Sequence, residues 1–210
     1  LLLTAFTLGA AHAVAPDHLA AVGVFVSRAH SPREALTHGA RWGIGHALTL
    51  TVAGLAVLFV ANEWPQLLSV RAEWLVGVVL IVLGVRTVIR ALNPRPVADL
   101  PTSRNAVRET SHAHRHPLLG IGMLHGLAGS GAMAAIVPLS AGQDPLRAAL
   151  WLALFGIGTI AAMAVIAGAA GWSLRRSARY SAAFVRRLVV GAGLLSAVVG
   201  VFWLAGTPLG

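Results

Sequence analysis

The chain has 210 residues, of which 57% are hydrophobic and 11% charged, and its mean hydropathy is +0.76. A soluble globular domain carries about 25% charged residues, so this composition excludes a soluble fold. The length leaves room for several spanning helices of about 20 residues each but for no sizeable extramembrane domain as well. We therefore expect an all-α polytopic membrane protein with a single transmembrane domain over residues 1–210.

The net charge is +9, and all 16 basic residues are arginine. In so hydrophobic a chain we expect this charge to lie at the membrane surface, so the lipid bilayer is a predicted partner and nucleic acid is not. The sequence contains no cysteine, which excludes thiolate metal ligands, disulfides and a thiol–disulfide electron carrier. Imidazole and carboxylate groups remain as the side-chain ligands for a metal.

Six apolar segments of spanning length follow one another along the chain. They are residues 3–26, 38–61, 74–92, 118–140, 147–172 and 187–206. The one long connection, residues 93–117, is rich in proline, arginine and histidine. The pattern predicts about six transmembrane helices.

Arginine is concentrated in the first, third and fifth connections between these segments, whereas the second and fourth hold only Arg71 and Arg147. Basic residues mark cytoplasmic connections. This asymmetry predicts a multi-pass protein of the inner (plasma) membrane with both termini outside and the 93–117 loop in the cytoplasm.

An internal repeat relates the two halves of the chain at a fixed shift of 113 residues. Gly9 and His12 correspond to Gly122 and His125, and the Gly-Ile-Gly segment 43–45 recurs at 156–158. Because each half holds three predicted helices, the second half would have the opposite orientation in the membrane. The sequence thus predicts a 3+3 inverted repeat, with halves 1–92 and 118–210, of the kind whose substrate site lies near the midplane of many secondary transporters.

The first predicted span contains His12, Asp17 and His18, and an ionisable side chain near the bilayer centre costs about 3 kcal/mol unless it has a partner or a polar cavity. On a regular helix Asp17 and His18 would point away from His12. Pro16 has no N–H for the carbonyl of His12, so we expect the helix to break near Ala15 and Pro16 and to leave that carbonyl unpaired. The break would bring the three side chains to one cavity.

His46 and His125 lie at a similar depth, within one or two turns of the midplane at 1.5 Å rise per residue. Taken singly, each has an alternative role as a hydrogen-bond partner between helices. Four imidazoles and one carboxylate at one depth suit Ni(II), Co(II) or Zn(II) better than Mg or Ca. The predicted metal ligands are His12, Asp17, His18, His46 and His125.

Ser130 and Thr159 occupy the positions equivalent to Asp17 and His46 in the second half, and for both a helix-packing role is at least as good an interpretation. The alternation of His112, His114 and His116 in the 93–117 loop suits either metal collection or a merely solvated loop, and we leave both open. His30 and His38, near a short turn, are not expected to take part.

Residues 9–22, which include His12, Asp17 and His18, resemble the His-x4-Asp-His signature of the nickel/cobalt transporter superfamily, with its NiCoT, UreH-type and RcnA-type members. Residues 41–46 are similar to its second-helix Gly-His motif, and residues 125–131 to the second-half motif of UreH-like members. The resemblance implies nickel or cobalt transport, with His12, Asp17 and His18 as substrate ligands and His46 as a further one. It leaves open the direction of transport, proton coupling and whether the chain forms a homo-oligomer.

Other functions fit the sequence less well, and no enzymatic activity is expected. An intramembrane serine protease would use Ser130 with a histidine base on a neighbouring helix, classically the last, but segment 187–206 has no histidine. A zinc metalloprotease is excluded because the sequence lacks His-Glu-x-x-His. The alternative that remains is a haem-binding membrane electron carrier with paired histidine ligands, which leaves Asp17 without a role.

Overall fold

The computed structural model of the protein describes residues 2–59, 66–93, 118–129, 144–179 and 181–206. Within these ranges the regular secondary structure is entirely helical, as the composition predicts. The helices are α1 (Leu2–His12), α2 (Pro16–Val26), α3 (Pro32–Phe59), α4 (Gln66–Leu92), a short helix Leu118–Gly129, α7 (Pro145–Ala178) and α8 (Ala182–Leu204).

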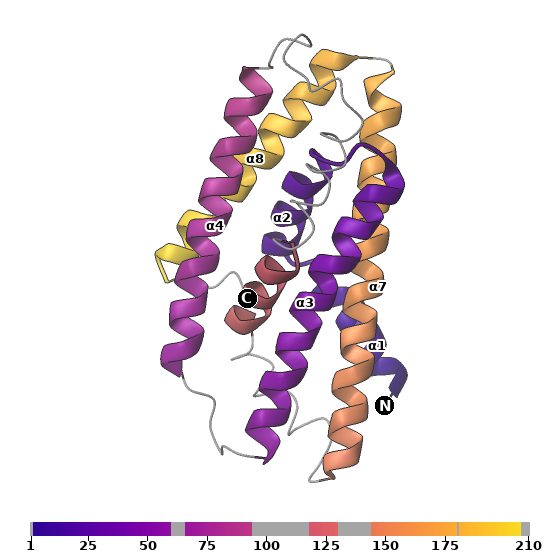
Figure 1. Ribbon diagram of the computed structural model, residues 1–210, viewed down its shortest axis with the longest axis vertical. Coiled ribbons are helices and arrows are strands. Elements are labelled where there is room, and N and C mark those ends of the chain that lie inside the picture. The colour runs from indigo at the N-terminus through magenta and orange to yellow at the C-terminus, as the bar shows by residue number, and fades with distance from the viewer. Residues whose placement is uncertain (1, 60–65, 94–117, 130–143, 180, 207–210) are drawn as a thin grey trace, which may run out of the picture.

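The long helices form two antiparallel pairs, α3 with α7 and α4 with α8, and α2 lies between the pairs (Figure 1). Glycines lie where the paired backbones approach most closely. In the second pair, Gly84 faces the backbone of Gly193 and Gly77 that of Gly200, with no space for a Cβ atom at either. Small residues are the usual means by which membrane helices pack closely.

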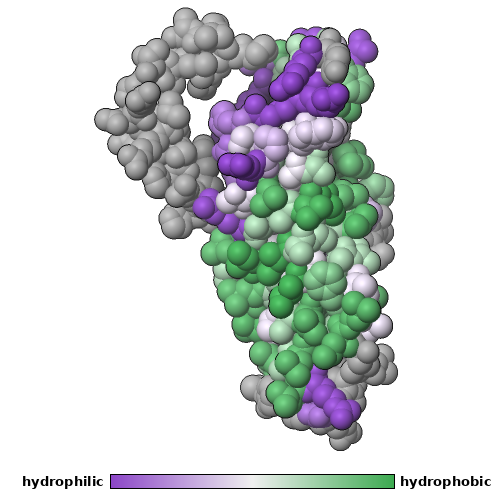
Figure 2. Space-filling view, turned by 90° about the vertical axis from the view of Figure 1, so that its right-hand side faces the viewer, coloured by the Kyte–Doolittle hydropathy of each residue, from purple (hydrophilic) through white to green (hydrophobic). Residues whose placement is uncertain are grey.

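Three of the described helices are long and apolar enough to cross a membrane, namely Arg71–Leu92, Leu146–Ala178 and Ala182–Leu204. The bent pair α1 and α2 makes a fourth if it counts as one span. The expected number of six spans is therefore not reached by the described residues, and residues 130–140 of the fourth predicted span lie outside them. On the face of the protein shown in Figure 2, a hydrophobic belt lies between two hydrophilic ends.

The predicted break in the first span is confirmed. α1 ends at His12, α2 begins at Pro16, and the two helices are bent by 61°. The expectation of an unpaired His12 carbonyl is wrong, because the Ala15 N–H donates to it over 3.1 Å. A tight turn with a bond between residues three apart thus replaces the one that Pro16 cannot make.

Several helices extend beyond the predicted spans. α3 begins at Pro32 rather than at residue 38, and α7 covers Pro145–Ala178 rather than 147–172. The Asp144 carboxylate accepts from the backbone N–H groups of Leu146 and Arg147, and so fixes the start of α7 at the proline that follows it. A span predicted from hydropathy ends at the first charged residues, whereas the helix itself continues through them to a capping residue.

Gly84→Ala should destabilise the protein by about 1–3 kcal/mol, because the new Cβ would press on the carbonyl oxygen of Gly193. Gly120→Ala is the matched control, since a Cβ there meets nothing within 4 Å and alanine favours a helix. Thermal unfolding in detergent measures both variants. Equal unfolding temperatures for the two would contradict the proposed role of Gly84 in packing.

Candidate metal centre

Four helical segments deliver the five predicted ligands to one place. His12 is the last residue of α1, Asp17 and His18 lie in the first turn of α2, His46 lies near the middle of α3, and His125 lies on the short helix Leu118–Gly129. The bend between α1 and α2 is what allows His12 to face His18, and their ring centroids are 4.7 Å apart.

Four of the five side chains at the centre are buried. The exposed fractions are 5% for Asp17, 1% for His18, 0% for His46 and 2% for His125, whereas His12 is only partly buried. Burial of so many polar groups is unfavourable unless they bond to one another or to a ligand. His12 therefore marks the accessible side of the cluster.

The Asp17 carboxylate joins two of the rings. His18 Nδ1 lies 3.1 Å from one of its oxygens and His125 Nε2 lies 2.7 Å from the other, so each ring donates an N–H to an ionised carboxylate. Asp17 also lies in the first turn of α2, where the helix dipole favours a negative charge. A carboxylate held in this way fixes the orientation and tautomer of both rings.

Because the Nδ1–H group of His18 donates to Asp17, the lone pair of this ring is on Nε2, which is the atom that could bind a metal ion. This Nε2 atom is buried and has no hydrogen-bond partner among the described residues. The Nε2 atoms of His12 and His46 lie 3.1 Å apart, so one of these rings donates to the other. The cluster thus contains ring nitrogens whose lone pairs have few N–H donors within reach.

Two overlapping trios could each hold an ion, His12 with His18 and His46, and Asp17 with His18 and His125. Within each trio the ligand atoms lie within 4.8 Å of one another. Opposite ligands on an ion with bonds of about 2.1 Å are about 4.2 Å apart, so small side-chain movements would close either trio. His18 belongs to both.

Aromatic side chains, which the sequence analysis did not identify, surround the histidines. The Trp42 ring lies 5.4 Å from that of His18 and 5.5 Å from that of His125, and Phe155 lies 5.5 Å from His12. Apolar rings at these distances lower the local dielectric constant and so strengthen electrostatic interactions inside the centre. The sequence contained two indications of these aromatic residues. Trp42 precedes His46 by one helical turn, and Phe155 is the residue equivalent to Trp42 at the 113-residue shift.

Thr159 does not face the cluster. Its hydroxyl lies 3.0 Å from the carbonyl oxygen of Gly9 and 2.9 Å from that of Phe155, so it ties α7 to α1 as a packing residue. His30 and His38 lie beside Glu34, away from the centre. Ser130, His112, His114 and His116 lie outside the described residues.

Comparisons with known proteins give two signals. Residues 5–202 match the family model described as the cytochrome c biogenesis protein transmembrane region. The chain is also 30% identical over 175 residues to the urease accessory protein UreH of Bacillus sp. (strain TB-90), which covers 78% of this chain and 72% of that protein.

Two chloroplast proteins of Arabidopsis thaliana, FOR GROWTH AND FERTILITY 1 and 2, are 29% and 28% identical to the chain. Each alignment covers 76% of this chain but only 46% and 44% of the plant proteins, so the chain spans less than half of their length. No solved structure matches the chain.

Thr159→Val should lower the free energy of unfolding by about 1 kcal/mol, because it removes the hydroxyl that links α7 to Gly9 while keeping the shape of the side chain. Thr159→Ser keeps the hydroxyl and is the control, which should retain most of the stability. Thermal unfolding in detergent distinguishes them. A valine variant as stable as the wild type would show that this link contributes nothing.

Proposed function

Because the chain belongs to the family of UreH-type membrane proteins and, over residues 5–202, to that of the cytochrome c biogenesis transmembrane region, we propose that it carries a divalent transition metal across the plasma membrane. Ni(II) or Co(II) is the proposed substrate, with Zn(II) next, because imidazole is a good ligand for all three. His12, Asp17, His18, His46 and His125 are the proposed substrate ligands.

The observation that carries this proposal is the buried Asp17 carboxylate among four imidazoles. A protein that needed only packing here would be more stable with apolar side chains, since polar groups in a membrane interior are costly. A divalent ion that sheds its water needs this combination, with neutral nitrogens for affinity and one negative charge to offset part of its own.

The two trios suggest a path for the ion. The trio of His12, His18 and His46 includes the partly exposed ring, so it would receive the ion from the accessible side. The trio of Asp17, His18 and His125 is buried throughout. His18 belongs to both, so the ion could pass inward without leaving this residue. The His18 and His125 nitrogens that donate to Asp17 would then have to lose their protons, or the rings would have to turn to present their other nitrogens.

We further propose that the chain is a 3+3 inverted repeat, with halves 1–92 and 118–210, six spans and both termini outside. Two pairs of close contacts, each made by a glycine with a backbone carbonyl, support it, because the members of each pair are exchanged by the 113-residue shift. The first pair is Gly9 with Phe155 and Gly122 with Trp42; the second is Gly45 with Leu119 and Gly158 with Phe6. Such contacts are expected where two similar halves meet around a pseudo-two-fold axis.

A haem-binding electron carrier is the second candidate, because the matching family model is described by cytochrome c biogenesis. Axial histidines must be separated by the flat macrocycle. The rings of His12, His18 and His46 pack directly on one another, with centroids 4.7–5.3 Å apart, which argues against a haem between them.

We expect the visible spectrum of the purified protein to lack a Soret band, and a strong band would favour haem.

Asp17→Asn should weaken Ni(II) binding about ten- to hundred-fold, because it keeps the shape of the side chain but removes the charge that orients His18 and His125. His18→Ala should have at least as large an effect, since both trios lose a ligand. Calorimetry on the detergent-purified protein measures affinity, and uptake of radioactive nickel by cells measures transport.

His30→Ala is the matched control, because His30 is an exposed histidine that lies beside Glu34 and far from the centre. It should bind and transport nickel like the wild type. Wild-type affinity for nickel, cobalt and zinc in both Asp17→Asn and His18→Ala would place the metal site elsewhere in the protein.

A further inference from the structure

One end of the protein carries an excess of positive charge. The end of α2, the start of α3, the ends of α4 and α7 and the start of α8 meet there, in the upper part of Figures 1 and 2. The arginines at this end are Arg28, Arg33, Arg86, Arg90, Arg175, Arg176, Arg179, Arg186 and Arg187. Among the described residues the one carboxylate at this end is that of Glu34, which already accepts a hydrogen bond from the His30 backbone.

Arg28 shows that this charge is not neutralised within the described part of the chain. Its Nε and Nη2 atoms are buried without a hydrogen-bond partner. Burial lowers the pKa of the Arg28 guanidinium, and the nearby positive charges of Arg90 and Arg86 lower this pKa further. The sequence of the 93–117 loop adds to the positive charge, since it contains four arginines and two carboxylates.

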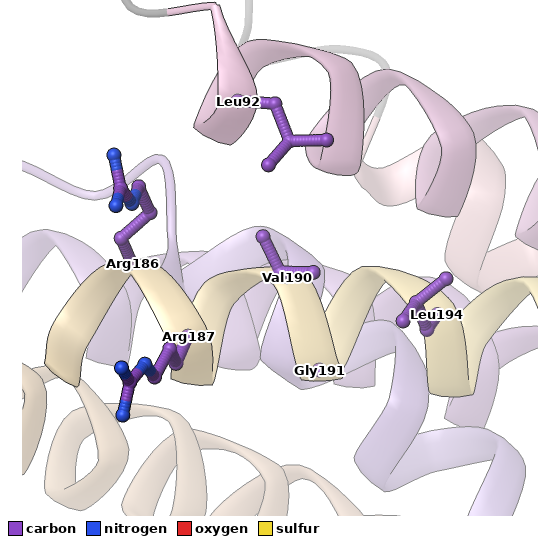
Figure 3. Close-up of a pocket in the computed structure, with 6 residues that line it drawn as sticks. All are labelled: Leu92, Arg186, Arg187, Val190, Gly191 and Leu194. Atoms are coloured by element: carbon purple, nitrogen blue, oxygen red, sulfur yellow. The ribbon is translucent and has the colours of Figure 1, made fainter. Parts of the chain in front are cut away.

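A groove of about 460 Å³ lies between the end of α4 and the start of α8 (Figure 3). Leu92 borders it on α4, and Arg186, Arg187, Val190, Gly191 and Leu194 border it on α8. In Figure 3, Arg186 and Val190 project toward the side on which Leu92 lies, whereas Arg187 projects to the opposite side. The space over Gly191 is open, because a Cβ there would meet nothing within 4 Å.

The packing of the helix pair places an arginine of α4 at the level of this groove. Gly77 faces Gly200 and Gly84 faces Gly193. These two contacts define which residue of α8 lies level with each residue of α4. Continued by six residues, this register brings Arg90 to the level of Arg187. The arginines of the groove itself are Arg186 and Arg187 of α8, and its other lining residues are leucine, valine and glycine. Arg90 lines a separate pocket with Arg86.

We propose that this groove binds an anionic phospholipid, with its phosphate beside Arg186 and an acyl chain along Val190 and Leu194. Both helices contain candidate membrane spans, so the apolar part of the groove would open onto the acyl chains of the bilayer. Basic pockets between transmembrane helices are suited to anionic headgroups. A free phosphate ion would use the arginines but not the apolar part, which favours a lipid.

The test compares phosphatidylglycerol with phosphatidylcholine, each added to the detergent-purified full chain, by the shift in unfolding temperature. Phosphatidylglycerol should stabilise the wild type more. Arg186→Gln should weaken phosphatidylglycerol binding about five-fold and reduce this difference. Gly191→Leu should abolish the difference without changing any charge, because the leucine side chain would fill the groove.

Arg175→Gln is the matched control, since it removes one exposed arginine at the same end but outside the groove. It should keep the wild-type difference. Three results would overturn the proposal: equal shifts with the two lipids, an equal loss in Arg175→Gln and Arg186→Gln, or a shift with inorganic phosphate alone as large as that with phosphatidylglycerol. If Gly191→Leu does not fold, the comparison of Arg186→Gln with Arg175→Gln still decides.

Discussion

The Asp17 carboxylate, shared between His18 and His125, is the interaction on which the rest of the centre depends. Its two oxygens lie 3.1 Å and 2.7 Å from ring nitrogens that come from two different helices. A charge buried to this extent is tolerated only where hydrogen bonds replace the lost water. The pairing therefore fixes α2 against the short helix Leu118–Gly129 and, among the described residues, leaves His18 Nε2 without a hydrogen-bond partner.

The broken first helix is the structural condition for this arrangement. The turn from His12 to Pro16 changes the direction of the chain by 61°, so that the end of one helix and the start of the next face the same centre. Pro16 loses nothing at the first position of α2, where its missing N–H would have no intrahelical partner. The Ala15 N–H satisfies the His12 carbonyl, so the break leaves no unpaired backbone group at that carbonyl.

Close backbone contacts hold the surrounding helices near enough to enclose the centre. Gly122 and Gly126 of the short helix lie against the backbone carbonyls of Trp42 and His46 on α3. Any larger residue would separate the two helices and with them His125 from His46. The packing of these helices is therefore linked to the proposed ligands, since Gly126 follows His125 directly and Gly122 lies three residues before it.

The sequence by itself determined the helical membrane character, the break before Pro16 and the small set of ionisable residues that meet in the centre. These follow from composition, from the missing N–H of proline and from depth along a helix, all of which are local properties. It placed helix ends less well, because hydropathy reports burial in lipid and not the capping of the backbone by residues such as Asp144.

Only the tertiary structure decided which ring nitrogens face one another, that Asp17 joins His18 to His125, and that Trp42 and Phe155 enclose the histidines. It also decided that Thr159, equivalent in position to His46, bonds instead to the backbone of α1. Periodicity gives the depth of a residue along its helix, but the rotation of that helix and the identity of its neighbours depend on contacts between segments far apart in the chain.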